Sequence, residues 1–225
     1  MPLKIHMISG LPRSGSTLLA AILRQNPCFH ASISTPLADL VANLIREMSA
    51  HEGGLLISSG QRERMVRALI GAYYSDTNGR LVFDTSRRWC SMLPLLSELF
   101  PDARVICCVR SPAWIIDSVE RAIHRNPLLA SRMFGHEITN VYQRTEKMIK
   151  DFLIAPAVGG LRQAWFGEHA GRLIAIRYDS LVRDPSGVID ALYRELREPR
   201  FEHDFDSLGI RRAGVRCLSR YAGSA

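Results

Sequence analysis

A glycine-rich segment between an apolar run and a helical run constrains the fold of this chain more than any other feature. Gly10-Leu-Pro-Arg-Ser-Gly-Ser-Thr17 follows the apolar run 3–8 and precedes the helical run 18–23. A strand that turns through glycines into a helix directs the first helical N–H groups, and the positive end of the helix dipole, at one point in space. The segment therefore predicts an anion site where the first strand of an α/β domain ends.

The spacing of the two glycines matches a phosphate loop, Gly-x-x-x-x-Gly, but the lysine that normally follows is missing. Ser16 stands in its place, and a cation appears three residues earlier as Arg13. Because that lysine neutralises the β- and γ-phosphates of a nucleoside triphosphate, its absence favours a phosphate-like ligand other than ATP. The alternative is a tight connection in which Ser14, Ser16 or Thr17 only caps the helix.

The rest of the chain alternates short β-type runs with helical ones. Strands are expected over 3–9, 80–84, 104–110 and 172–178, and the continuous apolar character of the third is typical of a parallel strand buried on both faces. Helices are expected over 36–50, 61–76, 88–100, 113–126, 137–153, 161–169 and, capped by Asp184, up to Leu196. The pattern predicts a single three-layer α/β domain over residues 1–205, with a central parallel sheet of about four to five strands. Residues 206–225 show no convincing period and are expected to form an irregular C-terminal tail.

The composition of the chain indicates where such a domain is located and which kinds of site it lacks. The chain has 225 residues, 47% of them hydrophobic, and no apolar stretch near the roughly 20 residues of a membrane span. Met1 leads almost directly into the first strand, which leaves no room for a signal peptide. The five cysteines lack metal-ligand spacing, and the adjacent Cys107 and Cys108 should point to opposite faces of a strand and pack as small hydrophobes. We expect a cytoplasmic protein with no membrane contact and no metal site.

The net charge of +7 favours an anionic ligand. Nucleic acid is not expected, because the chain has no dense basic run interleaved with aromatic residues and no helix-turn-helix or zinc signature. The apolar helices leave a homodimer open, although core packing is the commoner use of such helices.

Three further segments place polar side chains where strands end, which is where open α/β sheets bind ligands. Arg110 ends the third strand and Ser118 lies on the second turn of the next helix, so the two could hold one phosphate, unless Arg110 pairs with a carboxylate instead. Asp84 ends the second strand as a base, a metal ligand or a helix cap, and Arg87 then faces the ligand or solvent. Tyr178 ends the fourth strand, where it could simply cover the sheet edge.

Together, Gly10–Thr17 and Arg110–Ser118 resemble the two nucleotide signatures of the sulfotransferases, whose fold is P-loop NTPase-like. Pro12–Thr17 is similar to the Pro-Arg-Ser-Gly-(Ser/Thr)-Thr form found in tyrosylprotein, carbohydrate and many bacterial sulfotransferases. Tyr178–Pro185 is similar to the family's late Tyr-Glu-x-Leu segment, so the resemblance spans residues 3–205. It implies transfer of a sulfuryl group from 3′-phosphoadenosine 5′-phosphosulfate (PAPS) to a hydroxyl or amine of a small molecule, a sugar or a peptide tyrosine.

The resemblance also implies roles for single residues. In the family the first segment holds the 5′-phosphosulfate and the second holds the 3′-phosphate. The residues assigned to the donor are therefore Arg13, Ser14, Gly15, Ser16, Thr17, Arg110, Ser118 and Tyr178. Catalysis would be in-line displacement without a metal, because a transferring sulfuryl group carries less negative charge than a γ-phosphoryl group, and the Arg13 guanidinium would stabilise the leaving phosphate.

The chain departs from the family pattern at the catalytic base. The glutamate of the tyrosylprotein branch has no counterpart in 32–36, and Asp84-Thr-Ser-Arg87 replaces the lysine and histidine of the cytosolic branch. We therefore interpret Asp84 as the candidate base and Arg87 as a cation that contacts the sulfuryl group. The cytosolic branch's C-terminal Arg-Lys-Gly segment is also missing. Two alternatives stay open: a P-loop kinase or NTPase in which Asp84 holds magnesium, and a non-catalytic nucleotide-binding homologue.

Overall fold

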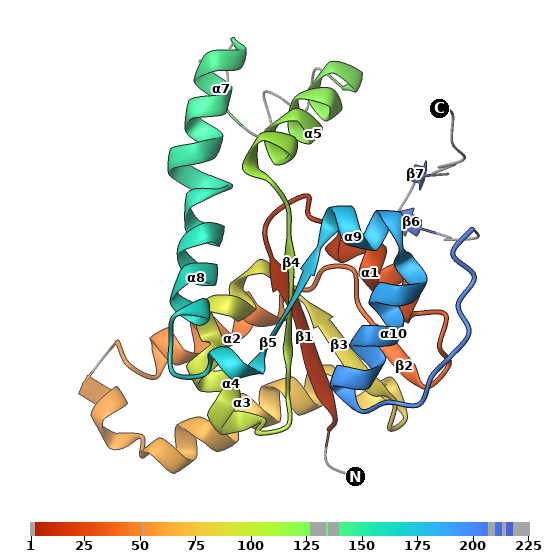
Figure 1. The fold of residues 1–225 in the computed structure, drawn as a ribbon. Helices are drawn as coiled ribbons and strands as arrows, with labels where there is room; N and C mark the ends of the chain where they lie inside the picture. The colour runs from red at the N-terminus through yellow and green to blue at the C-terminus, as the bar shows by residue number, and fades with distance from the viewer. Residues whose placement is uncertain are drawn as a thin grey trace.

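A five-stranded parallel sheet forms the centre of the computed structural model, which describes residues 3–50, 52–126, 134, 140–206, 210–212 and 215–217 (Figure 1). The strand order is β2-β3-β1-β4-β5, and every neighbouring pair is parallel. The strands are β1 (Ile5–Gly10), β2 (Phe29–Ala31), β3 (Leu81–Thr85), β4 (Val105–Val109) and β5 (Leu173–Arg177). The four strands expected from the sequence are confirmed. The edge strand β2 was not expected, because three residues are too short to show a period.

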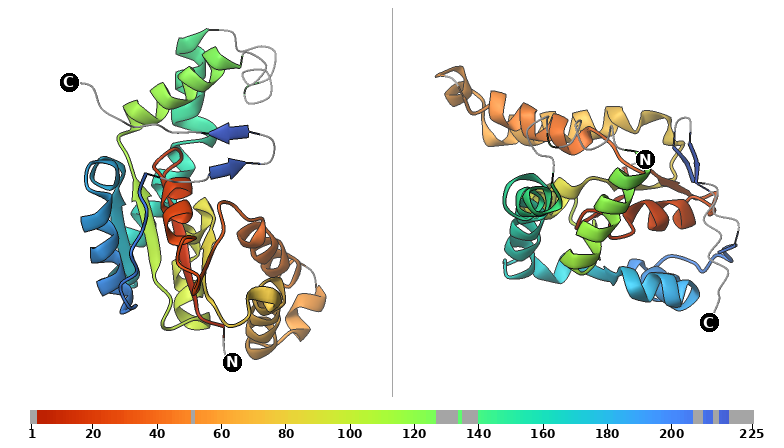
Figure 2. Two further views of the ribbon diagram at one scale, coloured as in Figure 1. Left: turned by 90° about the vertical axis from the view of Figure 1, so that its right-hand side faces the viewer. Right: turned by 90° about the horizontal axis from the view of Figure 1, so that it is seen from above.

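Helices cover both faces of the sheet, which confirms the three-layer α/β class (Figure 2). One face carries α2 (Leu37–Glu47), α3 (Ser59–Tyr73), the 3₁₀ segment η3 (Arg87–Met92) and α4 (Leu93–Leu99). The other carries α1 (Ser16–Leu23), α9 (Tyr178–Arg183) and α10 (Pro185–Leu196). Along β4, Cys107 packs into the first layer and Cys108 into the second, so the expected division of these neighbours is confirmed.

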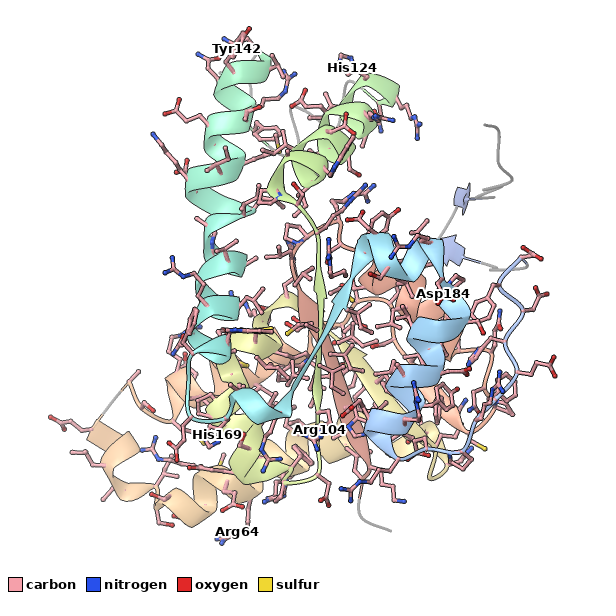
Figure 3. The ribbon with its side chains drawn as sticks, in the orientation of Figure 1. Arg64, Arg104, His124, Tyr142, His169 and Asp184 are labelled. Atoms are coloured by element: carbon pink, nitrogen blue, oxygen red, sulfur yellow. The ribbon has the colours of Figure 1, made fainter. Side chains whose placement is uncertain are left out.

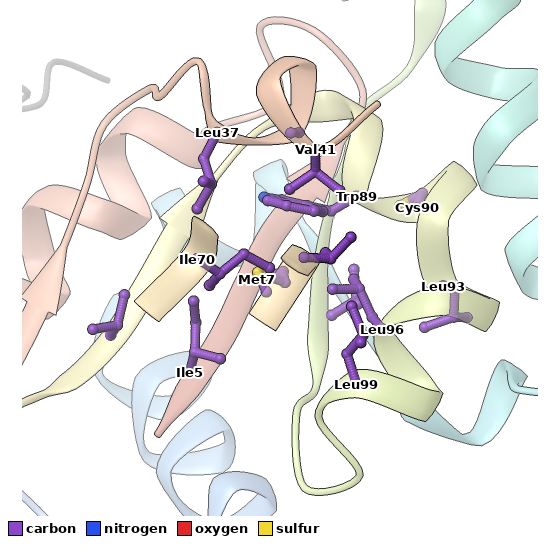
Figure 4. Packing of buried hydrophobic residues seen from close by; sticks show 14 of the residues in the cluster. Ile5, Met7, Leu37, Val41, Ile70, Trp89, Cys90, Leu93, Leu96 and Leu99 are labelled. Atoms are coloured by element: carbon purple, nitrogen blue, oxygen red, sulfur yellow. The ribbon is translucent and has the colours of Figure 1, made fainter. Parts of the chain in front are cut away.

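The first layer has a dense apolar core around Trp89, which is fully buried between sheet and helices (Figure 4). The helix expected over 88–100 is divided here. Residues 87–92 form η3, and α4 begins at Leu93 with Pro94 in its first turn, where a missing N–H has no intrahelical partner to lose. On the opposite layer the expected cap of α10 is present, since the Asp184 carboxylate accepts from the Gly187 N–H over 2.9 Å (Figure 3).

Two helices extend beyond the edge of the sheet at which its strands end (Figure 1). They are α5 (Pro112–Arg125) and α7 (Val141–Lys147), and α7 continues as the π-helical η4 (Met148–Phe152) into α8 (Ala155–Trp165). Helix α8 begins earlier than the expected Leu161, because a proline in its first turn starts it. Residues 137–139 of the expected helix 137–153 lie outside the described residues.

Short elements complete the described chain. They are η1 (Glu52–Leu56), η2 (Ser75–Thr77), η5 (Ala170–Arg172) and the strands β6 (Ile210–Arg212) and β7 (Val215–Cys217). The strands β6 and β7 pair as an antiparallel ribbon inside the segment expected to be irregular, and the remainder of 207–225 lies outside the described residues. Among the described helices, none has both the length and the apolar character needed to cross a membrane.

Candidate functional site

The loop from β1 to α1 is built on three residues with left-handed backbone conformations. The φ angles are 109° at Gly10, 54° at Arg13 and 96° at Gly15. A Cβ at Gly10 would collide with the backbone of Cys108, and a Cβ at Gly15 would lie 2.9 Å from the Tyr178 ring. Only glycine meets both the conformational and the steric demand at these two positions. The loop thus brings its backbone close to β4 and α9. Helix α1 begins at Ser16, two residues before the helical run 18–23 that the sequence predicts.

Ser14 anchors this loop to the sheet. Its side chain is buried, and its hydroxyl lies within hydrogen-bonding distance of the carbonyl oxygens of Leu11 and, at 2.8 Å, of Cys108. The same Cys108 oxygen accepts from the Leu11 N–H over 2.8 Å. Because the Ser14 hydroxyl is engaged within the protein, only its backbone N–H is left for the ligand contact that the sequence predicts. Ser16 and Thr17 lie half-buried in the first turn of α1.

The loop and helix α5 meet through side chains that are far apart in sequence. Arg13 Nε donates to Ser118 Oγ over 3.0 Å, across a separation of 105 residues. Arg110 Nη1 donates to the Arg13 carbonyl oxygen over 3.3 Å. Pro112 occupies the first turn of α5, which fixes where the helix begins and sets Ser118 on its second turn. The two segments singled out in the sequence therefore form one site.

Tyr178 and Arg110 form the wall of this site. The guanidinium carbon of Arg110 lies 4.1 Å from the centroid of the Tyr178 ring, a cation–π contact. The same ring packs against Gly15. The Arg110 Nε atom is buried and lacks a hydrogen-bond partner in the described structure, and no described carboxylate pairs with this arginine. An unpaired buried donor is costly, on the order of 1–3 kcal/mol, and an anionic ligand that reaches the guanidinium would offset that cost.

Asp84, the candidate base predicted from the sequence, is buried among protein donors. Its side chain is 0% exposed, and it accepts from the Thr35 hydroxyl over 2.7 Å, from Trp89 Nε1 over 2.6 Å and from the Tyr74 hydroxyl. Burial, reinforced by the charge of Asp84, raises the pKa of Tyr74, so its hydroxyl stays a donor. A general base must reach the proton that it removes. This carboxylate is enclosed and accepts from three protein donors, which is the geometry of a residue that holds several segments of the protein together.

Arg87 and its neighbours follow the end of β3. The Arg87 side chain is exposed and makes no ion pair or hydrogen bond within the part of the chain that is described, whereas its carbonyl accepts from the Ser9 hydroxyl over 3.0 Å. Arg88 is directed to the exposed Asp39, with Nε 2.6 Å from Oδ1. Ser86 caps η3, since its hydroxyl accepts from the Arg88 N–H. The side chain of Arg87 is thus available to a ligand at this edge.

Several residues that organise the site carry no motif and were missed from the sequence. They are the three donors to Asp84, named above, and a buried ion pair between Glu120 on α5 and Arg144 on α7. The only signal for the first group is the position of Asp84 at a strand end, and a helical charge pattern alone does not distinguish Glu120 from exposed acids. Within the described residues no group of three or more His, Cys, Asp or Glu side chains is arranged to hold a metal ion.

Comparison with known proteins agrees with this geometry. The family model described as the sulfotransferase family matches residues 7–203. The sulfotransferase domain of the curacin biosynthetic pathway has 21% identity and a TM-score of 0.59, over 90% of this chain and 76% of that one. A sulfotransferase from Alicyclobacillus acidocaldarius has 16% identity and a TM-score of 0.60, over 92% of this chain and 86% of that one. No curated protein matches by sequence. The solved structures share the P-loop NTPase-like fold. Because the family model matches most of this chain, the chain belongs to the sulfotransferase family.

Proposed function

We propose that the protein transfers the sulfuryl group of PAPS to a hydroxyl or amine acceptor. The observation that carries the proposal is the hydrogen bond from Arg13 to Ser118, because it joins the two segments that resemble nucleotide signatures into one anion-binding site. Family membership supports sulfotransfer as the reaction. The choice of donor rests on the pairing of a loop for one phosphate with a second arginine and serine for another.

The donor would be held at two ends. Backbone N–H groups of the loop, with the hydroxyls of Ser16 and Thr17 at the start of α1, would bind the 5′-phosphosulfate. Arg110 and Ser118 would bind the 3′-phosphate, and the orphaned Nε of Arg110 fits that role. When bound, the donor supplies a sulfuryl group on a phosphate that leaves readily. Tyr178 fixes the plane of the Arg110 guanidinium by stacking on it.

Two arginines would assist the transfer by electrostatics. Arg13 presents a planar fork that can contact two phosphate oxygens, and charge accumulates on the leaving phosphate during transfer. Arg87, exposed at the end of β3, would contact the sulfuryl oxygens. Asp84 would act through the protein instead, by fixing the segment that carries Arg87. We assign it a positioning role.

The acceptor class and the cellular location of the protein are the last two parts of the proposal. A hydroxyl or amine on a small molecule, a sugar or a peptide tyrosine is compatible with the site. We propose a cytoplasmic location, since the described cysteines Cys28, Cys90, Cys107 and Cys108 are free thiols.

The donor assignment is tested by thermal shift with 3′-phosphoadenosine 5′-phosphate, compared with ATP and magnesium. A ligand at 100 times its Kd stabilises a protein by about 2.7 kcal/mol, which corresponds to roughly 5–10 °C in Tm for a chain of this size. We expect this shift with the bisphosphate and its loss in Arg110→Ala. The matched control is Arg64→Ala, which removes the same charge from an exposed site on α3, at the end of the molecule opposite α5 (Figure 3).

The outcomes separate the candidate functions. A shift with ATP and magnesium alone would place the protein among kinases or NTPases and overturn the proposal. Binding of the bisphosphate without sulfate transfer from PAPS to any member of an acceptor panel would indicate a non-catalytic homologue. Binding together with transfer would support the proposal in full.

A further inference from the structure

Two buried cysteines from different elements lie in direct contact beneath the candidate site. Cys90 Sγ, in η3, is 3.1 Å from Cys107 Sγ, in β4. Both side chains belong to the apolar core of the same layer, in which Cys90 lies beside Trp89 and Leu93 (Figure 4). A disulfide has an S–S distance of about 2.05 Å, so the two sulfurs need to approach by only about 1 Å to form a covalent bond.

The two thiols have different chemical surroundings. Hydrogen bonding to Cys107, followed by that to Ser9 and to the Gly10 backbone, lowers the pKa of Cys90, while burial opposes the change. The same contact with Cys90, together with burial, raises the pKa of Cys107. Since the thiolate is the reactive form of cysteine, Cys90 is the better nucleophile of the pair.

A small cavity leads from the surface to one of the two thiols. It has a volume of about 30 Å³ and is lined by Cys90, Pro94, Gln163, Glu168 and His169, among others. His169 lies in the segment that follows α8 (Figure 3), and the Gln163 and Glu168 side chains are exposed. A cavity of this size admits one molecule of about the size of water. Both residues are buried, with exposed fractions of 2% for Cys90 and 0% for Cys107, but Cys107 is not part of the cavity lining. A small oxidant therefore reaches Cys90 first.

We infer that Cys90 and Cys107 form a reversible disulfide when the protein meets hydrogen peroxide. The Cys90 thiolate attacks one oxygen of the peroxide, the O–O bond breaks, and the hydroxide leaves as water with the proton that the thiol gave up. The Cys107 sulfur then attacks the Cys90 sulfenic sulfur, and the hydroxyl leaves as water with the Cys107 proton. Two thiols and hydrogen peroxide thus become a disulfide and two molecules of water. A dithiol reductant reverses the bond.

The disulfide would act on the neighbouring loop. The Cys90 N–H donates to the Ser9 hydroxyl over 3.2 Å, and that hydroxyl donates to the Arg87 carbonyl over 3.0 Å. A shift of Cys90 toward β4 therefore displaces both Arg87 and the end of β1, from which the loop begins at Gly10. We therefore expect oxidation to lower the affinity for the donor nucleotide, an effect that rests on the proposed function.

The bond itself is tested on the wild-type protein by peptide mapping. Trypsin releases peptide 89–104, with Cys90, and peptide 105–110, with Cys107 and Cys108. After stoichiometric hydrogen peroxide, alkylation of the remaining thiols and digestion without reductant, we expect these two peptides to be linked, and to separate with dithiothreitol. The link should disappear in Cys107→Ala and persist in Cys108→Ala, a matched control because Cys108 is equally buried but faces the other layer.

A different pattern would overturn the inference. An absent link, or one that survives in Cys107→Ala, shows that these two residues do not pair. Titration with 3′-phosphoadenosine 5′-phosphate tests the consequence, for which we expect about a tenfold fall in affinity, within the range typical of coupled sites. An unchanged affinity in the linked protein would refute the regulatory effect. Absence of binding in the reduced protein would instead refute the proposed function, because peptide mapping needs no nucleotide.

Discussion

Arg13 and Ser118 join the first loop to helix α5 through a hydrogen bond of 3.0 Å between Nε and Oγ. Because Ser118 accepts this bond, the proton of its hydroxyl is available to a ligand oxygen. The Arg110 guanidinium donates to the backbone of Arg13 from the other side. The relation makes the two halves of the site interdependent, so a change in one half is expected to weaken phosphate binding at the other.

Replacement of Ser118 tests that dependence. We expect Ser118→Ala to weaken binding of 3′-phosphoadenosine 5′-phosphate by roughly 10- to 100-fold, because a hydrogen bond to a charged group contributes about 1.5–3 kcal/mol. Isothermal titration calorimetry measures the change. The exposed Ser75, on η2, provides a matched Ser→Ala control that should bind as the wild type does. Equal affinities in both variants would show that Ser118 does not contact the nucleotide.

Replacement of Asp84 distinguishes a positioning role from a catalytic one. Asp84→Asn turns an amide N–H₂ toward donors that now have no acceptor, at about 1–3 kcal/mol for each buried group left unsatisfied. We expect Tm to fall by several degrees, while the remaining activity keeps its pH profile. Tyr74→Phe removes one of the three donors and should have a smaller effect on Tm. A rate loss of about 10²–10⁴ at unchanged Tm would restore Asp84 as the base.

This carboxylate also shows where inference from sequence ends. The position of Asp84 at the end of a strand was predictable from the apolar run before it, as was the strand-loop-helix unit at Gly10. Its role was not, because two of its partners, Thr35 and Tyr74, lie 49 and 10 residues away and approach only when α2 and α3 pack on the sheet. Likewise Arg110 and Ser118 were recognisable as a pair, whereas the bond from Arg13 that joins them to the loop depends on the direction of α5.

Buried His6 predicts an acid-sensitive stability. Its Nδ1 accepts from the Arg104 N–H over 3.0 Å, and burial, followed by the charge of Arg104, lowers its pKa from 6.5 to about 4. The unfolded chain therefore binds more protons between these two values, and stability falls as the pH is lowered from 6.5 toward 4, by about 3 kcal/mol in total.

The contribution of His6 is isolated by a variant that does not titrate. His6→Asn keeps an acceptor for the Arg104 N–H but carries no charge at any pH in this range. Urea unfolding at pH 7 and at pH 5 should show a larger loss of unfolding free energy in the wild type than in the variant. A parallel loss in both proteins would assign the acid sensitivity to other groups.

The buried pair Glu120–Arg144 is expected to fix the direction of α5, and hence the place of Ser118. Arg144 Nε and Nη2 donate to the two carboxylate oxygens over 2.9 and 2.6 Å, and the two side chains are only 10% and 11% exposed. Removal of one partner leaves the other charge buried, which costs about 3–5 kcal/mol, whereas replacement of both by apolar side chains is often neutral. We therefore expect Arg144→Met to lower the free energy of unfolding by about 3 kcal/mol, and Glu120→Leu with Arg144→Met to regain most of it.

A second ion pair on the same helix provides the control for this cycle. Arg121 and Asp117 are 2.9 Å apart but 64% and 40% exposed, so Arg121→Met should change stability by less than about 1 kcal/mol. If the pair positions α5, Arg144→Met also weakens nucleotide binding. The double variant then recovers stability without recovering full affinity, because two apolar side chains lack the directional hydrogen bonds of the guanidinium–carboxylate pair. Recovery of both together would mean that apolar packing alone sets the angle between α5 and α7, and that the charges contribute nothing to the site.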